Sequence, residues 1–189
     1  MVDDLRNNLV EFVKQRIGSG LLHHSVDCDN VPIITVGRAN LIEILQVLRD
    51  DTKWHLSFLN WLTAIDYPDD AYRFQVVYDL RNIVNHNRVR LKVPIPQNDA
   101  WIPTITGLYP GANWHEREMM ELFGIVVRDH PDPRKLILPD WVDDHPLRKD
   151  FPHGGEELWK FHQKTIQMFN DKNDYPGDMD EPWLEKFNS

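Results

Sequence analysis

Apolar residues recur at helical spacing in three stretches of the chain. Residues 2–17 place their apolar side chains on one face, and the pattern stops at Gly18-Ser19-Gly20. Residues 40–51 (NLIEILQVLRDD) repeat this spacing, and Asn40 is a residue type that is common at helix N-caps. A third, shorter stretch covers residues 113–123. We therefore predict three helices, the first two of which cover one face of a sheet.

Four other stretches have the pattern or the composition of β-strands. Residues 21–28 and 31–36 are short apolar runs, whereas residues 72–80 and 88–93 alternate apolar and polar side chains. Alternation is typical of strands that turn one face to the core. We expect an α+β fold, with a small mixed or antiparallel sheet covered by helices and followed by a proline-rich extended C-terminal strap.

Proline spacing divides the rest of the chain. From Pro94 to Pro152, prolines recur so often that only one good helix fits between them. The predicted organisation is an α+β core domain over residues 1–127, a proline-rich docking strap over 128–152 and an extended partner-binding tail over 153–189. The tail mixes acidic residues, glycine and proline with aromatic side chains, so we expect it to lie on another surface.

Charge and composition narrow the choice of partners. The chain has 189 residues and a formal charge of −9, and its basic residues form no stripe, so nucleic acid is not expected. The single cysteine, Cys28, cannot form a disulfide within the chain or hold an iron–sulfur cluster alone. The first residues of the chain include acids where a secretory or mitochondrial presequence carries basic residues, so we expect no presequence. The longest proline-free run without Asp, Glu, Lys or Arg, residues 54–65, is shorter than the about 20 residues that cross a bilayer, so membrane association is expected only through partners.

The stretch NWHEREMMELFG, residues 113–124, combines charged groups with large apolar ones. A zinc protease motif needs a second histidine one turn after His115, but Met119 stands there. The other histidines of the chain lack the spacing that directs two imidazoles at one ion. Neither the glycine pattern of a nucleotide site nor a serine nucleophile motif occurs. The sequence therefore predicts no metal and no cofactor on this chain.

A helical projection separates the side chains of this stretch into two groups. Met119, Met120 and Phe123 point one way, together with Glu116, and are expected to pack into the domain. Glu116 also follows Asn113 by three residues, the spacing of a capping box. The opposite face is charged and aromatic, and serves either as a solvated face or for ion pairs with another chain. It comprises Trp114, Arg117, Glu118, Glu121 and Leu122.

Two segments give the sequence a family resemblance. EREMMELFGIVVRDHPDPRKLIL starts at Glu116, and HPLRKDFP ends at Pro152. Together they resemble the thirty-kilodalton subunit, designated C, of proton-translocating NADH:quinone oxidoreductase (respiratory complex I). Every position of the family signature is matched, from its Glu-Arg-Glu triplet to its final pair of apolar residues. The resemblance covers residues 54–152.

The resemblance implies an accessory subunit in the hydrophilic arm of this translocase, lying against the quinone-site subunit, designated D, and beside other hydrophilic-arm subunits. It implies no catalytic centre on this chain, and it places flavin, iron–sulfur clusters and quinone on partner subunits. The implied location is peripheral, at the cytoplasmic face of a bacterial or archaeal plasma membrane. Similar subunits occur in energy-converting nickel–iron hydrogenases, formate hydrogenlyases and ferredoxin or deazaflavin dehydrogenases, which stay open as alternatives.

We assign a partner-binding role to charged residues of the third helix and of the strap, and no residue to catalysis, metal or cofactor. These side chains are expected to form ion pairs and hydrogen bonds across an interface with the quinone-site subunit. The predicted residues are Glu116, Arg117, Glu118, Glu121, His130, Arg134, His145, Arg148 and Lys149.

Two hypotheses from other functional classes also follow from the residues. One is a stand-alone hydrolase that uses Glu118 and Glu121 with His115 or His130, since neighbouring carboxylates can divide into an acid and a base. No nucleophile, oxyanion site or metal motif accompanies these residues in the sequence. The other hypothesis is a free-standing adaptor outside any redox enzyme.

Overall fold

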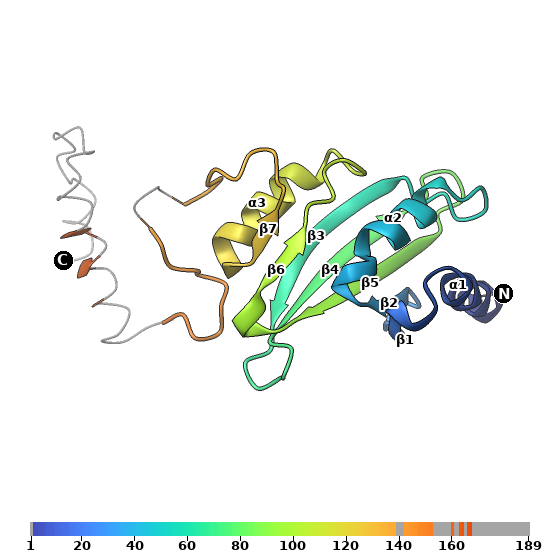
Figure 1. Cartoon of the computed structure of the whole chain (residues 1–189), viewed down its shortest axis with the longest axis horizontal. Coiled ribbons are helices and arrows are strands. Elements are labelled where there is room, and N and C mark those ends of the chain that lie inside the picture. Colours follow the sequence, from blue (N-terminus) through green and yellow to red (C-terminus); the bar gives the residue numbers. More distant parts are fainter. Residues whose placement is uncertain (1, 139–141, 153–159, 161–162, 165, 168–189) are drawn as a thin grey trace, which may run out of the picture. The chain divides into compact units, whose positions relative to one another are not determined.

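A five-stranded sheet organises the fold (Figure 1). The computed structural model describes residues 2–138, 142–152, 160, 163–164 and 166–167. The strands are β1 (Leu21–Val26), β2 (Pro32–Val36), β3 (Phe58–Asp66), β4 (Phe74–Arg81) and β5 (Arg88–Ile95). They lie in the order β1-β2-β5-β4-β3, in which β2 and β5 run parallel and the other neighbours run antiparallel. The sheet is therefore mixed, as the sequence predicts.

Three helices and a second, smaller sheet accompany the five strands. The helices are α1 (Val2–Ile17), α2 (Leu41–Asp50) and α3 (Ala112–Phe123). In Figure 1, α2 crosses in front of the strands, and α3 packs beside β3. The small sheet pairs β6 (Trp101–Pro103) with β7 (Val126–Arg128) in parallel. Short 3-10 helices occur at Gly18–Gly20, Arg38–Asn40 and Gln97–Asp99.

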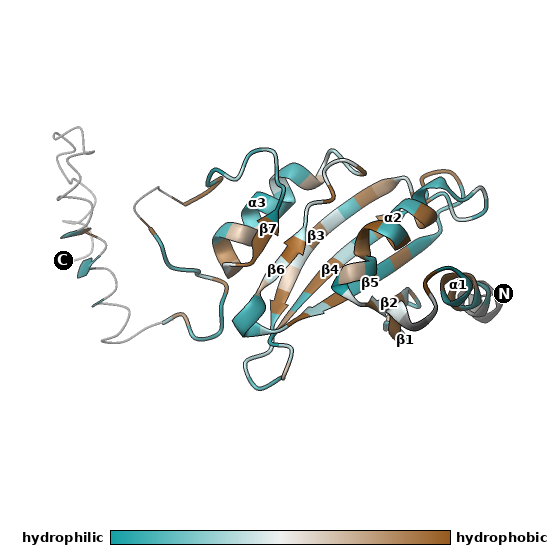
Figure 2. Cartoon of the chain, in the orientation of Figure 1, coloured by the Kyte–Doolittle hydropathy of each residue, from teal (hydrophilic) through white to brown (hydrophobic). Residues whose placement is uncertain are grey.

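The main core lies between the helices and one face of the sheet. Figure 2 shows hydrophobic residues alternating with hydrophilic ones along the central strands. On β5 the buried members are Val89, Leu91, Val93 and Ile95. The face of α2 that meets them buries Leu41, Ile44, Leu45 and Leu48. Side chains of α1 belong to the same core, which agrees with the prediction that both helices cover one face of the sheet.

Most predicted elements are confirmed with small shifts at their ends, but β3 is an exception. The sequence pattern does not predict it, because its apolar run lacks clean alternation. A register shift between Leu59 and Trp61 interrupts its pairing with β4 and explains the irregular pattern. The predicted strand over 72–80 begins at Phe74. The sequence pattern also misses β6 and β7, which are too short to show a period.

Contacts divide the chain into two units. The first comprises residues 1–138 and 144–151, and the second comprises 139–143 and 152–189. Most of the predicted aromatic tail lies outside the described residues, as does the middle of the predicted strap. The boundaries at 128 and 153 and the strap as one extended element therefore stay predictions. Within the described part of the chain, no helix is both long and apolar enough to cross a membrane.

Replacement of a buried leucine in α2 tests the packing of this helix on the sheet. Leu45 is fully buried, so Leu45→Ala is expected to lower the free energy of unfolding by about 2–5 kcal/mol, because it leaves a cavity. The same change at Leu22, which is 57% exposed, is expected to alter it by less than about 0.5 kcal/mol. Denaturant unfolding of both variants measures the difference. Equal losses would contradict the described packing of α2.

Candidate functional site

Glycines stand at both ends of α3, the helix that carries most of the predicted site residues. Gly111 occupies the N-cap position and offers no side chain to cap the helix. Gly124 adopts the left-handed conformation with a φ of +69°, and its N–H donates to the carbonyl of Met120. Met119 and Phe123 are buried in the core, and Met120 is partly buried against it. The predicted inward face of α3 is thereby confirmed.

The carboxylate of Glu116 is buried between α3 and the chain that follows β6. It accepts hydrogen bonds from the Thr104 hydroxyl at 2.6 Å and from the backbone N–H of Ile105 at 2.7 Å. Burial raises the pKa of Glu116, although both hydrogen bonds and the nearby His130 favour its charged form. The predicted capping box is therefore wrong. The helix begins before Asn113, and Glu116 points to a distant loop instead of to the helix end.

His130 completes this buried cluster. Its side chain is fully buried, with Nε2 3.6 Å from Oε2 of Glu116. Nδ1 accepts a hydrogen bond from the backbone N–H of Asp132 at 3.0 Å, and Nε2 lies 3.2 Å from the carbonyl oxygen of Asn113. Because Nδ1 accepts a hydrogen bond and Nε2 faces a carbonyl oxygen, a ring hydrogen lies on Nε2. His130 thus fastens the chain after β7 to the start of α3, and neither ring nitrogen keeps a lone pair for a metal.

Arg117 and Glu121, one turn apart on α3, hold the chain beyond β7. The Nε of Arg117 donates to the carbonyl of Arg134 at 2.7 Å, and a second guanidinium nitrogen donates to the carbonyl of Lys135 at 2.9 Å. Glu121 accepts the backbone N–H groups of three successive residues, Leu136, Ile137 and Leu138. We call residues 130–138 the first bound segment.

Glu121 supplies acceptors that the first bound segment lacks. No strand or helix forms over 130–138, so its backbone N–H groups need other partners. Burial alone would raise the pKa of Glu121, but the three N–H groups lower it overall. Glu121 is buried, and the side chain of Arg117 is only 11% exposed. The solvated charged face, one of the two alternatives from the helical projection, is therefore wrong for these two residues, because the first bound segment covers them. Their contact with a partner stays a prediction.

Residues 144–151 form a second bound segment at the C-terminal end of α3. The His145 ring N–H, the Leu147 backbone N–H and the Arg148 Nε–H donate in this order to the carbonyls of residues 121–123. The distances are 2.8, 3.1 and 2.6 Å. The last turn of a helix leaves these carbonyls without partners inside the helix. A cation such as Arg148 is also favoured at the negative end of the helix dipole.

Gly124 leaves the space that the second bound segment occupies. A Cβ atom at this position would collide with the guanidinium of Arg148 and the imidazole of His145. The left-handed backbone of Gly124 independently favours glycine. Gly124 is not among the predicted site residues. A glycine directly after a helix is the sequence signal that could have identified it.

A buried ion pair anchors the far end of the second bound segment. Arg73 donates to both carboxylate oxygens of Asp66, at 2.7 and 2.9 Å, and the two side chains are 7% and 0% exposed. Asp66 also accepts the backbone N–H of Lys149 at 2.7 Å, and Arg73 pairs with Asp150 at 2.9 Å. The hydrogen bond from Arg73 lowers the pKa of Asp66, although burial opposes this. Sequence reasoning missed the contact of this pair with the second bound segment, because 83 positions separate Asp66 from Lys149.

The nine predicted residues fall into two groups by their contacts. Glu118 is half-buried and makes no hydrogen bond or ion pair within the described residues. Arg134 pairs with Asp132 at 2.6 Å, and Lys149 contributes its backbone N–H while its side chain is exposed. Six side chains bond to the backbone of this chain, and their role in partner binding stays a prediction. They are Glu116, Arg117, Glu121, His130, His145 and Arg148.

Glu121 and His130, two residues of the hydrolase hypothesis, are held by contacts with protein atoms. A general base must reach a proton of its substrate. Both oxygens of Glu121 are occupied by backbone N–H groups. Glu116 and His130 are enclosed and bonded to protein atoms. This arrangement fixes the backbone and does not favour the hydrolase hypothesis.

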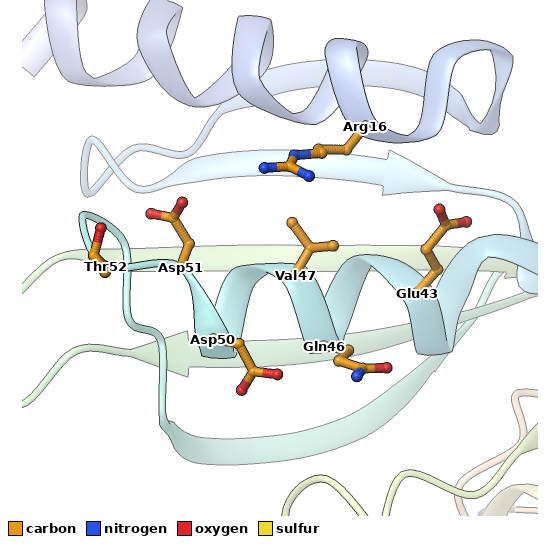
Figure 3. Close-up of a pocket in the computed structure, with 7 residues that line it drawn as sticks. All are labelled: Arg16, Glu43, Gln46, Val47, Asp50, Asp51 and Thr52. Carbon is orange, nitrogen blue, oxygen red and sulfur yellow. The ribbon is translucent and has the colours of Figure 1, made fainter.

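A hollow of about 440 Å³ opens between α1 and α2 (Figure 3). Three acids, Glu43, Asp50 and Asp51, line it, and Figure 3 shows Arg16 reaching toward them from α1. Asp50 is already paired with Arg49 at 2.7 Å. Ligand pockets usually bury their ligand against apolar walls. This charged lining, with a single valine, instead resembles a solvated groove.

One group of potential metal ligands occurs in the part of the chain that the structure describes. It consists of Asp27, Cys28 and Asp29. Asp27 already forms an ion pair with Arg90, and the other two residues are exposed. An exposed acidic turn of this kind has a sufficient explanation in solvation and in its ion pair.

A family model covers the region that contains these contacts. The model described as "Respiratory-chain NADH dehydrogenase, 30 Kd subunit" matches residues 34–157, which include α3 and both bound segments. The chain belongs to this family. The resemblance drawn from the signature is thereby confirmed, and the chain is a member of a family of oxidoreductase-complex subunits.

Individual relatives and solved structures agree with this family. The NADH-quinone oxidoreductase subunit designated C of Roseiflexus sp. is 40% identical over 127 residues, 67% of this chain and 73% of the relative. That of Citrifermentans bemidjiense is 40% identical over 155 residues, 80% and 92% of the two chains. The trypsin-resistant fragment of Nqo5 superposes with a TM-score of 0.57 at 28% identity, over 66% of this chain and 98% of the fragment. The predicted fold class is confirmed.

A second structural neighbour shares the fold alone. It is a chain of the membrane-bound sulfane sulfur reductase, an archaeal respiratory membrane complex, with a TM-score of 0.63. The superposition covers 92% of this chain and 96% of the other, at 20% sequence identity. The fold therefore extends beyond the NADH-quinone oxidoreductases.

Gly124→Ala tests whether the second bound segment depends on the absence of a side chain. The methyl group would displace Arg148 and His145, and alanine is strained at this φ, so we expect the free energy of unfolding to fall by about 1–3 kcal/mol. Trypsin should also cleave faster at Arg148. The matched control is Gly107→Ala, because an added Cβ there meets open space. If the two variants behave alike, contact with Gly124 does not hold the segment.

Glu121→Gln tests the carboxylate that binds the first segment. At pH 7 we expect a loss of about 1.5–3 kcal/mol in unfolding free energy, because a neutral amide replaces a charged acceptor. Glu118→Gln, one turn away, should change it by less than about 0.5 kcal/mol. Denaturant unfolding of both variants and of the natural chain measures this.

The contribution of Glu121 to stability depends on pH in a defined direction. Its pKa is lowered in the folded chain, so its stabilising effect is present above the unfolded pKa and is lost as the pH falls through the folded value. The difference in unfolding free energy between Glu121→Gln and the natural chain should therefore become smaller as the pH falls below about 4.3. A difference that does not change with pH would contradict this account.

Proposed function

We propose that the chain is a non-catalytic, peripheral-arm subunit of a NADH:quinone oxidoreductase, and that it scaffolds the quinone-site subunit during electron transfer from NADH to quinone. Membership of the family supports the type of complex. One observation carries the scaffold role: Arg117, Glu121, His145 and Arg148 bond to the chain's own backbone. These side chains fix a surface.

The proposed docking surface consists of exposed apolar side chains on α3 and on the bound segments. We call it the α3 surface. Trp114 on α3 is 71% exposed, and Ile137 in the first bound segment is 59% exposed. The backbone N–H groups of this segment bond to Glu121, while the side chain of Leu136 remains 41% exposed. Leu147 adds an exposed side chain from the second segment. Exposed apolar groups on a fixed backbone are typical of protein–protein contacts.

The nine predicted partner-binding residues take two roles in this proposal. The six that bond to the backbone of the chain act on the partner indirectly, by holding the bound segments in position. The other three offer charge to a partner: Arg134 is 81% exposed, Lys149 is exposed and Glu118 is half-buried. Charged groups of this kind suit the polar rim of an interface.

The proposal places the redox groups on other subunits. Flavin, iron–sulfur clusters and quinone belong to partners, with the quinone-site subunit as the main neighbour and other hydrophilic-arm subunits beside it. The enclosure of Glu116 and His130 by protein groups supports this division. The chain would then be a peripheral protein on the cytoplasmic face of a bacterial or archaeal plasma membrane, held there by its partners. Residues 153–189 would extend the contact.

The alternative is the equivalent subunit of an energy-converting nickel–iron hydrogenase, a formate hydrogenlyase or a ferredoxin or deazaflavin dehydrogenase. The fold of the archaeal respiratory complex is compatible with it, but at 20% identity that likeness concerns the fold alone. Relatives at 40% identity are NADH-quinone oxidoreductase subunits, which favours the first proposal. The subunits that copurify with the chain distinguish the two, since a NADH-binding flavoprotein and a hydrogenase subunit indicate different complexes.

Purification of the tagged full chain from its native membranes tests the scaffold role. The natural chain should copurify with flavin-bearing and cluster-bearing subunits. Ile137→Asp should lower that yield about tenfold or more, because it places a charge in an apolar contact. Val84→Asp is the matched control, since Val84 is 86% exposed on the β4–β5 turn. Turnover per assembled complex should stay unchanged. A chain that purifies alone, or normal assembly of Ile137→Asp, would refute the proposal.

A further inference from the structure

The small sheet of β6 and β7 has one face in the core and one at the surface. Ile102 and Val127 point inward and are 0% and 5% exposed. The alternate residues of both strands form the outer face, because side chains alternate along a strand. These are Trp101, Pro103, Val126 and Arg128. We call this set the Trp101 face. It contains Val126, which is 59% exposed.

Trp101 carries two arginines against its ring. The guanidinium carbon of Arg128 lies 3.4 Å from the ring centroid, and that of Arg38 lies 4.0 Å from it. Such cation–π stacking orders side chains that otherwise have high rotamer freedom.

The two arginines differ in their charge partners. Arg38 pairs with the carboxylate of Asp99 at 2.6 Å and donates to the carbonyls of Asp99 and Trp101 at 2.9 and 3.2 Å. Arg128 is exposed and lies near enough to the Asp99 carboxylate to help lower its pKa, but among the described residues it forms no ion pair with a carboxylate. An ordered positive charge is thus left at the surface of a chain whose formal charge is −9.

We propose that the Trp101 face binds a segment of a neighbouring protein chain that carries an Asp or Glu carboxylate beside an apolar side chain. The planar guanidinium of Arg128 receives the carboxylate through two parallel N–H···O bonds. The apolar side chain packs on Val126 and the edge of Trp101. Because stacking already orders Arg128, binding loses less side-chain entropy than at a free surface arginine. Tryptophan and arginine are also the residue types that most often dominate interface energies.

This inference rests on the proposed work of the chain within a complex, but not on which subunit the α3 surface binds. Two other occupants of the Trp101 face are outcomes of the test. One is the acidic region over residues 153–189 of the same chain. The other is water, which leaves the face simply solvated.

Site-specific crosslinking in the assembled complex tests the proposal. A photoreactive amino acid replaces Val126 in the tagged full chain, the complex is purified from native membranes and illuminated, and mass spectrometry identifies the crosslinked peptide. We expect a peptide of another subunit that contains an Asp or Glu next to an apolar residue. Crosslinks to residues 153–189 alone, or none at all, would overturn the proposal.

Charge reversal then tests the role of Arg128. Arg128→Glu should lower the crosslink yield about tenfold, and reversal of the identified acid to lysine should restore it. Arg81→Glu is the control, since Arg81 is an exposed arginine on another strand. An unchanged yield in Arg128→Glu refutes the assigned role. If the complex assembles but position 126 gives no crosslink, this inference fails while the scaffold role stands. A chain that purifies alone overturns both.

Discussion

The structure around α3 depends on one constraint: a segment without helix or strand must still find partners for its backbone N–H and C=O groups. The two bound segments meet it by using α3. Arg117 donates to carbonyls and Glu121 accepts N–H groups, so that two side chains one turn apart replace a neighbouring strand. At the other end of the helix the direction is reversed, because His145 and Arg148 donate from the segment to the helix carbonyls.

The composition of the first bound segment suits this arrangement. Pro131 and Pro133 have no N–H group and fix their own φ, which reduces both the number of donors to satisfy and the entropy lost on ordering. The remaining donors near Glu121 come from successive residues, and one carboxylate can accept all of them. Bonds to a charged group are stronger than neutral ones, so few contacts suffice. The buried Asp66–Arg73 pair anchors the second segment by the same means.

The sequence predicts what depends on local periodicity and misses what depends on distant contacts. The spacing of apolar residues gives α1, α2 and β5, and it places Glu116 on the inward face of α3. The local capping rule then assigns Glu116 the wrong partner, because Thr104 comes from a loop that no helical pattern can position. The link from Asp66 to the second bound segment spans 83 positions and leaves no periodic trace. An irregular register hides β3 in the same way.

The signature of this family is explained better by recognition of backbone within the chain than by ion pairs between chains. Ion pairs across an interface need charged groups that are free on both sides, whereas Arg117 and Glu121 are already bonded and nearly buried. Arg117 and Glu121 therefore fix the position of the backbone, and the exposed side chain of Ile137 is carried by that fixed backbone. A partner that binds such a surface gains affinity from apolar contact. In the proposed interface, exposed guanidinium groups such as that of Arg134 would act mainly on orientation and on the rate of association.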